Sequence, residues 1–450
     1  MTADSGSTLQ PNLSAKIPGS NASSRTPPPL IPLAFLFSAL IALAVAGLVS
    51  FHFGKQFITD PTSDEIVGNV HLYLLGFVSF GILGALHQFG PVITMERLLS
   101  IRLAYVSFSF LVVGIIVMPV GLISQSEVLT ALGGASLGIG IFAVVINLYK
   151  PLIKGKSSVS LTGLRISMGY LLITACFGVT FASTHSSFSP PTHLVLAHAS
   201  FGLIGFAGIS YMAVSERLWP MFLLSHGNKA SYGIRAIYLV AAGEIVLASG
   251  LILDVEFLAI AGGLIICTGI IHHFISLYGY IKNRNRKLEI LHGYIFVSAA
   301  CLAVSIVMAI LALTLNVGSI TRDHLAVLTV VFVFGWLSIA LLGHLHKIVP
   351  FILWGVLRNH GVTRLRNKKP IMFANLFVGN LAKLTLLLMS AGLGIFSIGM
   401  VSGSVYVVKS TGLIVSLAAG ITLFNLSITP LVIFFRTKER SIKVGIKTLN

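Results

Sequence analysis

Three copies of one seventeen-residue pattern divide the sequence at a constant interval. The copies occupy residues 76–92, 205–221 and 335–351, and each begins with glycine and carries a proline fifteen positions later. The spacing of the copies is even to within one position. The first and third copies share Gly76 and Gly335, Ser79 and Ser338, Gly84 and Gly343, Leu86 and Leu345, His87 and His346, and Pro91 and Pro350. Because copies at a constant period indicate repeated structural units, the sequence predicts three units of about 130 residues.

Most of each unit is apolar enough to cross a membrane. Apolar residues make up 55% of the chain and charged residues only 10%, whereas about a quarter of the residues in soluble domains are charged. A membrane-spanning helix needs about twenty apolar residues. Twelve segments meet this requirement: 31–53, 68–93, 102–124, 128–149, 164–183, 194–222, 233–253, 256–281, 289–315, 324–352, 371–400 and 404–435. The predicted fold class is an all-α integral membrane protein with about 12 transmembrane helices in three pseudo-threefold four-helix units.

The predicted organisation is a single membrane domain with a polar tail at each end. The domain covers residues 31–435, in repeat units at about 31–160, 161–288 and 289–435. The repeated pattern closes the second, sixth and tenth helices of this domain. Residues 1–30 are rich in Ser, Pro, Thr and Asn, which predicts a disordered cytoplasmic tail. Residues 436–450 are predicted to form a basic cytoplasmic tail.

Positive charge gathers on one side of the predicted helices. The side reached after each even-numbered helix holds both tails and 26 of the 30 Lys and Arg residues. The opposite loops hold only Lys55 and Arg322, together with seven acidic residues. Because cytoplasmic loops are enriched in Lys and Arg, both termini are predicted to lie in the cytoplasm. The net charge of +17 is spread over separate loops and forms no single patch, so no nucleic-acid partner is expected.

Glu244 and three cysteines stand out inside the predicted spans. Glu244 lies in the middle of the seventh helix and is predicted to face protein, because an unpaired carboxylate in lipid costs several kcal/mol. Cys176, Cys267 and Cys301 all fall in apolar segments, where a free cysteine behaves as a small hydrophobic residue. The cysteines therefore predict neither a disulfide framework nor a metal-binding knuckle.

The histidines of the repeated helices form two levels. The outer level consists of His71, His198 and His324, and the inner level of His87, His344 and His346. Neutral imidazole is a common metal ligand and also binds haem iron. A single histidine within a membrane is equally well explained by a hydrogen bond to its surroundings, so the pattern of several histidines carries the prediction.

At the inner level, three residues at one register have side chains that bind metals in other proteins. His87, Glu216 and His346 each stand four residues before the proline of their copy. If the repeated helices surround one axis, these side chains face equivalent directions, and two imidazoles with one carboxylate form a known non-haem metal triad. The alternative is that this register faces lipid or the clefts between units. Together with His344, these three residues are the predicted metal site.

Twelve helices in three units, with histidines on helices 2, 6 and 10, resemble subunit I of the haem-copper oxidases. The resemblance covers residues 31–435 and is carried by HLYLLGF from His71, HASFG from His198 and GHLHKIVPF from Gly343. These motifs are most similar to divergent bacterial members described only as polypeptide I-like relatives of the cytochrome c and quinol oxidases. The resemblance implies a protein of the bacterial inner (cytoplasmic) membrane, with haem and with copper or another transition metal as cofactors.

The resemblance also implies which residues hold the cofactors. His71, twenty residues before Pro91, matches the position of the low-spin haem ligand on helix 2. His198 approximates the copper ligand on helix 6, although the strict register, twenty residues before Pro220, falls on Ser200.

Helix 10 departs from the family pattern at its outer end. The family carries His-x-His there, whereas this chain has Leu328 and Val330 at the equivalent positions. His324, six residues before Val330, is the outer-end histidine of this helix. The predicted cofactor ligands are therefore His71, His198 and His324.

Two functions of different classes fit these features. The first is a haem- or metal-binding protein linked to respiratory electron transfer, and His71 with His198 favours it. The second is a non-catalytic relative that acts as a haem or metal sensor, an assembly factor or a transporter, and the missing His-x-His favours it. The expected partners are the lipid bilayer and, by resemblance, other respiratory subunits or an electron donor. No catalytic residue is assigned.

Overall fold

The computed structural model describes residues 26–447, apart from residues 186, 227–230, 315–318 and 366. Residues 1–25 of the predicted N-terminal tail lie outside the described residues. The described part of the chain contains helices and no strand, and twelve candidate spans in it are long and apolar enough to cross a membrane. The predicted all-α class with twelve transmembrane helices is confirmed.

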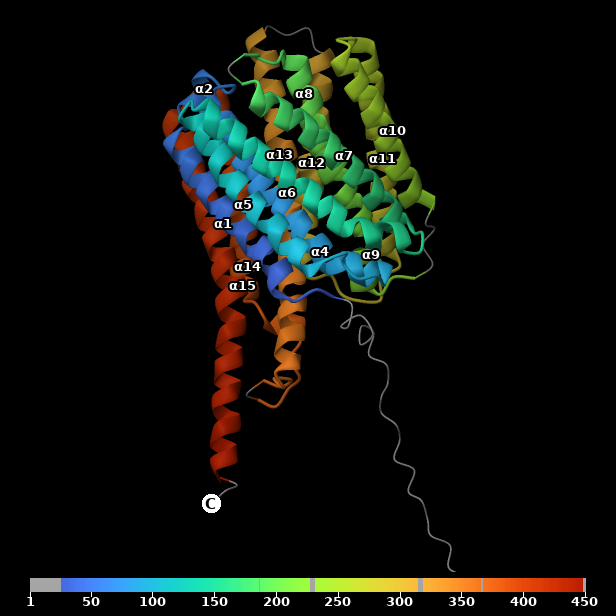
Figure 1. The fold of residues 1–450 in the computed structure, drawn as a ribbon, viewed down its shortest axis with the longest axis vertical. Helices are drawn as coiled ribbons and strands as arrows, with labels where there is room; N and C mark the ends of the chain where they lie inside the picture. The colour runs from blue at the N-terminus through green and yellow to red at the C-terminus, as the bar shows by residue number, and fades with distance from the viewer. Residues whose placement is uncertain (1–25, 186, 227–230, 315–318, 366, 448–450) are drawn as a thin grey trace, which may run out of the picture.

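Ten spans are single helices, and the second and sixth are jointed. The single helices are α1 (Leu30–His52), α5 (Ile101–Ile123), α6 (Glu127–Lys154), α7 (Val159–Ser183), α10 (Ser231–Ile252), α11 (Glu256–Lys282), α12 (Ile290–Thr314), α13 (Ser319–Asn359), α14 (Gly379–Ser402) and α15 (Val405–Lys447). The second span joins α3 (Asp64–His71), η1 (Leu72–Ser79) and α4 (Phe80–Thr94), and the sixth joins α8 (Thr192–Ser200), η2 (Phe201–Gly208) and α9 (Ile209–Leu223). The start of α1 and the end of α15 lie on the same side of the bundle (Figure 1).

The second, sixth and tenth spans meet around a small central cavity of about 60 Å³. Twelve of its thirteen lining residues form four sets of three, with one residue from each of the three spans. Within a set, the residues are as far apart along the chain as Gly76, Gly205 and Gly335 are, so they are equivalent in the repeat. The sets are Val78, Ala207 and Leu337; Gly81, Ser210 and Ala340; Ile82, Tyr211 and Leu341; and Ala85, Val214 and His344. Equivalent positions therefore surround one axis, which is the predicted pseudo-threefold arrangement.

The glycines that open the three copies lie at close helix contacts. A Cβ atom on Gly76 would lie 2.7 Å from Ala42 Cβ, and one on Gly205 would lie 2.5 Å from Tyr170 Cγ. A Cβ atom on Gly335 would lie 2.7 Å from Leu393 Cδ2. Small residues allow transmembrane helices to approach one another closely, so the repeated glycine fixes how each copy packs against its neighbours.

The joints in the second and sixth spans are π-helical, and the sequence did not indicate them. The segments Leu72–Ser79 and Phe201–Gly208 are equal in length and occupy equivalent positions of the first and second repeat units. The equivalent residues of the third unit, 331–338, lie within the continuous helix α13. π-helical turns are rare in proteins, and those that occur are frequently at functional sites. The second and sixth spans have such turns next to His71 and His198, and residues 331–338 of the tenth span do not.

One predicted boundary near the C-terminus is wrong. Helix α14 begins at Gly379, eight residues after the predicted start, because residues 371–378 are held in a hairpin by contacts with the end of α13. In the predicted basic tail, residues 436–450, the part up to Lys447 continues α15 as helix, and residues 448–450 lie outside the described residues. This segment contains no proline and is rich in Lys and Arg, which are good helix formers.

Candidate functional site

The structure brings His71 and His198 together in the second and sixth spans, near the ends that lie away from the Lys/Arg-rich side. Their ring centroids are 6.2 Å apart, and the ring planes differ by 24°. His71 ends α3 directly before the first π-helical segment, and His198 lies three residues before the second. Two of the three predicted cofactor ligands are thus neighbours from different repeat units.

Each of these two rings retains a nitrogen that could bind a metal. His71 donates its Nδ1–H to the carbonyl oxygen of Val67 at 2.8 Å, which leaves a lone pair on Nε2. Metal-binding histidines commonly anchor their second nitrogen in this way. The His198 ring interacts with the backbone of Thr174, but its buried Nδ1 has no hydrogen bond of good geometry. A buried polar atom without such a bond is rare in proteins and calls for an explanation.

The two rings lie close together in a stacked arrangement. Their centroids are 6.2 Å apart and their planes are nearly parallel. Imidazole nitrogen is a common ligand of transition metals and of haem iron, so the pair brings two side chains of a suitable chemical type to one place between the two spans.

The surroundings of His198 leave room for its ring. A Cβ atom on Gly178 of α7 would lie 3.2 Å from His198 Cε1, closer than most carbon contacts in proteins. The edge of Phe181 on the same helix packs against the imidazole, with ring centroids 5.8 Å apart. Gly178 and Phe181 hold the orientation of His198, and no sequence pattern singled out either of them.

Ser200, the strict repeat equivalent of His71, does not take part in the pair. Its hydroxyl donates a hydrogen bond to Ala197 O at 3.0 Å. The Ser200 side chain also interacts with Glu244 of α10, which is fully buried in the protein. The prediction that Glu244 faces protein is confirmed, although neither of its carboxylate oxygens has a hydrogen bond of good geometry.

The third predicted outer ligand, His324, lies on α13 and is partly exposed. Val330, the strict equivalent of His71 on this helix, is 46% exposed. Val330 therefore stands where the second span has His71, and α13 runs without a π-helical segment through residues 331–338.

The predicted metal set His87, Glu216, His344 and His346 is not brought together. His87 stacks on Phe35 of α1 at a centroid distance of 4.9 Å, and His346 packs at an angle on Tyr294 of α12 at 5.5 Å. Among the described residues, no group of three or more His, Cys, Asp or Glu side chains could hold a metal ion. Residues 87, 216 and 346 follow the axial register 85, 214 and 344 by two positions, which rotates them by about 200° around each helix.

His344 differs from the other three members of the set because it does line the central cavity. Its Nε2 atom and the Oγ atom of Ser210 are both buried without a hydrogen-bond partner, and both residues line the cavity. A cavity needs a volume of about 10–15 Å³ to hold one water, so this space is large enough for water. The axial site is small, and Ser210, Tyr211 and His344 contribute polar side chains to its lining.

Several polar residues around Glu216 were not selected from the sequence as one group. Tyr280 donates a hydrogen bond from its hydroxyl to Glu216 Oε2 at 2.7 Å, and His273 Nδ1 lies 4.0 Å from Glu216 Oε1. The ring of Tyr211 contacts both His273 and His344, at centroid distances of 5.5 and 6.1 Å. His273 and Tyr280 are seven residues apart, which places them on one face of α11, and this spacing was the available signal.

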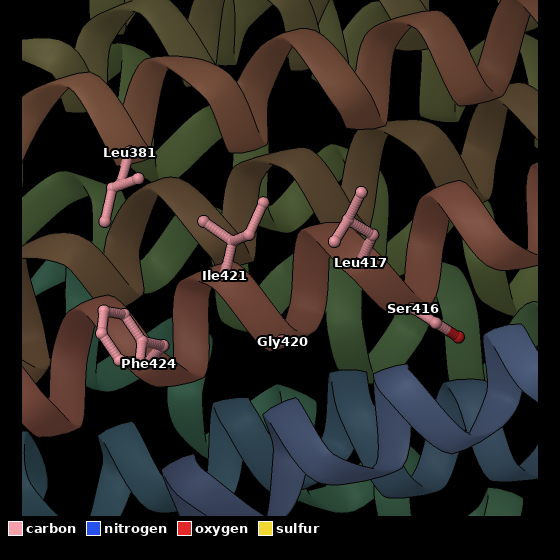
Figure 2. Close-up of a pocket in the computed structure, with 6 residues that line it drawn as sticks. All are labelled: Leu381, Ser416, Leu417, Gly420, Ile421 and Phe424. Carbon is pink, nitrogen blue, oxygen red and sulfur yellow. The ribbon is translucent and has the colours of Figure 1, made fainter.

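A separate groove of about 490 Å³ lies between α14 and α15 near the first helix (Figure 2). Its lining residues are Leu381, Ser416, Leu417, Gly420, Ile421 and Phe424. The hydroxyl of Ser416 donates a hydrogen bond to Ala44 O at 2.6 Å. The remaining walls are apolar, so this groove contributes no cofactor ligand.

No protein-family model matches the chain, and no curated protein matches it.

Proposed function

We propose that this polytopic membrane protein binds a haem or a transition-metal ion between His71 and His198. The observation that supports the proposal is the pair of nearly parallel imidazole rings, 6.2 Å apart, contributed by two repeat units. The buried Nδ1 of His198 and the anchored Nδ1 of His71 add the chemistry of a ligand pair. The scaffold is of the haem-copper oxidase subunit I type, and the role is linked to respiratory electron transfer.

A haem or copper at this place would supply one-electron redox chemistry. The protein would contribute the two ligands, and the side chains around them would tune the potential of a bound metal. Other respiratory subunits or a separate electron donor are the expected partners.

The test is cofactor content by pyridine haemochrome and metal analysis after expression with ample haem, iron and copper. Wild-type protein is expected to contain one of these cofactors, and His71→Ala and His198→Ala are each expected to lose it. His272→Ala, on α11 and partly exposed, is the matched control and is expected to retain it. Wild-type protein free of haem and metal would refute the proposal, and unchanged content in both variants would move the site elsewhere.

A second candidate is a non-catalytic haem or metal sensor, an assembly factor or a transporter. It is favoured by Leu328 and Val330, which stand where the family has two histidines on helix 10. Binding without oxygen consumption would distinguish this function from that of a terminal oxidase. Oxygen uptake by the reduced, cofactor-loaded protein is the measurement.

We further infer that both termini face the cytoplasm of a bacterial inner membrane. The described chain begins and ends on the side that holds most Lys and Arg residues, which is the cytoplasmic side by the positive-inside rule. A phosphatase that folds only in the periplasm, fused after Asn450, is expected to be inactive. An active fusion would reverse the orientation.

A further inference from the structure

The third repeat unit contains an insertion that the first lacks. Pro91 and Pro350 are equivalent residues of the first and third copies. Ser100 and Val378 are also equivalent, since the backbone N–H of each bonds to an asparagine Oδ1 47 residues later. Val378 follows its proline at a much greater distance than Ser100 does, so the third unit has roughly twenty additional residues between the tenth and eleventh spans. The repeat accounts for the membrane-spanning helices. It does not account for these additional residues between the tenth and eleventh spans.

The insertion begins where the other repeated spans stop. The second and sixth spans end at residues with left-handed backbone conformations, Met95 (φ 58°) and Leu224 (φ 49°), which are equivalent in the repeat. The equivalent residue of the third unit, Trp354, is helical, and α13 continues to Asn359. Six further residues extend the helix by roughly 9 Å. The helix therefore extends past the ends of the second and sixth spans by more than the thickness of the polar layer of a bilayer, which is roughly 5–8 Å on each side.

The inserted segment, residues 354–378 apart from residue 366, folds as a hairpin with a small core, against which Ile433 and Phe434 of α15 pack. Leu357, Val362, Ile371 and Leu376 are buried together in it. Trp354 Nε1 donates a hydrogen bond to Ile371 O at 2.8 Å, which ties the end of the helix to the returning chain. The hairpin stands beside α15, beyond the inner end of the bundle (Figure 1).

The surface of the basic hairpin, as we call residues 354–378, is strongly positive. Its sequence contains five Lys and Arg residues and neither Asp nor Glu. Arg358, Arg364, Lys368 and Lys369 are all exposed. The guanidinium of Arg358 lies 4.6 Å from the centroid of the Trp354 ring, which limits its motion.

The basic hairpin has a folded core, which is more structure than a loop needs if it only sets the orientation in the membrane. A loop that only fixes topology needs positive charge and no folded structure, as in the short connection of residues 155–158 between α6 and α7, which contains Lys156. A preorganised surface loses less conformational entropy on binding than a loose one. Met372, 56% exposed, adds an apolar contact beside the charges, and Met and Arg are enriched in protein interfaces.

We propose that the basic hairpin is a docking surface for a protein partner with an acidic surface on the Lys/Arg-rich side of the membrane. The extension of the hairpin beyond the ends of the second and sixth spans favours a partner in the aqueous phase over lipid headgroups. The proposal is independent of the histidine pair, and a protein that binds no cofactor could still dock its partner here.

The first experiment places a photo-crosslinking amino acid at Met372 of the full chain in cells. The control position is Ser157, exposed in the α6–α7 connection on the same side. A polypeptide adduct is expected at Met372 and not at Ser157. Adducts with phospholipid in place of polypeptide, or no adduct, would overturn the proposal.

The second experiment measures the affinity of the crosslinked polypeptide for the purified protein in nanodiscs. The triple variant Arg364→Gln, Lys368→Gln and Lys369→Gln is expected to bind about tenfold more weakly, because acidic and basic surfaces attract at the interface. The matched triple control is Lys150→Gln, Lys154→Gln and Lys156→Gln, which is expected to keep the wild-type affinity. Equal affinity of the two triple variants would overturn the proposal.

Folding of the hairpin is checked independently. The Ile371 N–H donates to Thr363 O at 3.0 Å, so its hydrogen-exchange protection reports on the hairpin. If the triple variant loses this protection, Met372→Glu replaces it, since this exposed position contributes no core side chain. Met372→Glu is expected to lower the affinity as well, and an unchanged affinity would count against the proposal.

Discussion

The outer and inner levels of histidines behave in opposite ways. The inner residues His87, Glu216 and His346 occupy identical register and never meet, whereas His71 and His198 are out of register by two positions and lie with their rings 6.2 Å apart. In a pseudo-threefold bundle, identical register guarantees equivalent directions, and only the register that lines the axis gives convergence. Two residues that lie away from the axis come together only when their positions in the repeat differ, as those of His71 and His198 do.

The largest expected effect comes from moving the histidine of the sixth span from position 198 to position 200, which is the repeat equivalent of position 71. In the double variant His198→Ala and Ser200→His, the imidazole is displaced by two residues, or about 200° around the helix. Position 200 faces Ala197 O and Glu244, so cofactor content is expected to stay as low as in His198→Ala. The pyridine haemochrome and metal assays measure it. Restored content would show that strict register is compatible with binding.

A second prediction concerns the repeat packing beneath the inner level. A Cβ on Gly343 would lie 2.6 Å from Tyr294 Cβ, whose ring packs on His346. Gly343→Leu is expected to lower the free energy of unfolding by about 3 kcal/mol, because overpacking displaces neighbouring groups. Gly355→Leu, where nothing lies within 4 Å of a new Cβ, is the control. Denaturant unfolding in detergent compares them, and equal stabilities would argue against the tight contact.

A third prediction separates the hydrogen bond of Glu216 from metal binding. Glu216→Leu leaves the Tyr280 hydroxyl without its acceptor and is expected to cost about 2 kcal/mol of stability. Glu216→Gln retains an acceptor oxygen and is expected to cost less than half as much. Both variants are expected to keep wild-type metal content. Loss of metal in Glu216→Gln would restore the inner level as a metal site.

The smallest effect is expected at the axis. His344→Leu removes a buried Nε2 atom that has no partner, and the free energy of unfolding is expected to change by less than about 1 kcal/mol. The measurement is thermal unfolding of His344→Leu. Ala85→Leu, which places the same side chain at the equivalent position of the second span, is measured for comparison. A loss of several kcal/mol in His344→Leu would mean that this nitrogen is bound to a group inside the cavity.

The repeat made the architecture predictable, including the axial meeting of the second, sixth and tenth spans. The angular phase around each helix was not predictable, because these helices are apolar on most sides and lack a polar face that marks a direction. For this reason His87, Glu216 and His346 could not be placed on the axis or away from it from sequence. His71 and His198 were selected because they match ligand positions of the family. A match to a family position indicates which side of a helix a residue faces, and composition does not.

Local interactions were the least visible in the sequence. Residues 371–378 are mostly apolar and were assigned to the eleventh helix, since the hydrogen bond from Trp354 that holds them in a hairpin joins residues 17 positions apart. The π-helical segments depend on how two spans pack, and their residues, such as Leu72 and Phe201, are ordinary helix residues.

The π-helical joints give the second and sixth spans two separately adjustable halves. One residue added to or removed from a helix turns everything beyond it by about 100°, and a π-helical turn is a place where such a change is absorbed locally. In the second span, the inner half remains packed on α1 through Gly84, where a Cβ atom would lie 2.8 Å from Phe35 Cβ, while the outer half turns. A lineage could thus re-aim the residue at position 71 by a single-codon insertion or deletion in Leu72–Ser79, without redesigning the core. The continuous helix α13 lacks this freedom, so a histidine on its outer end would have to arise by substitution at the correct position.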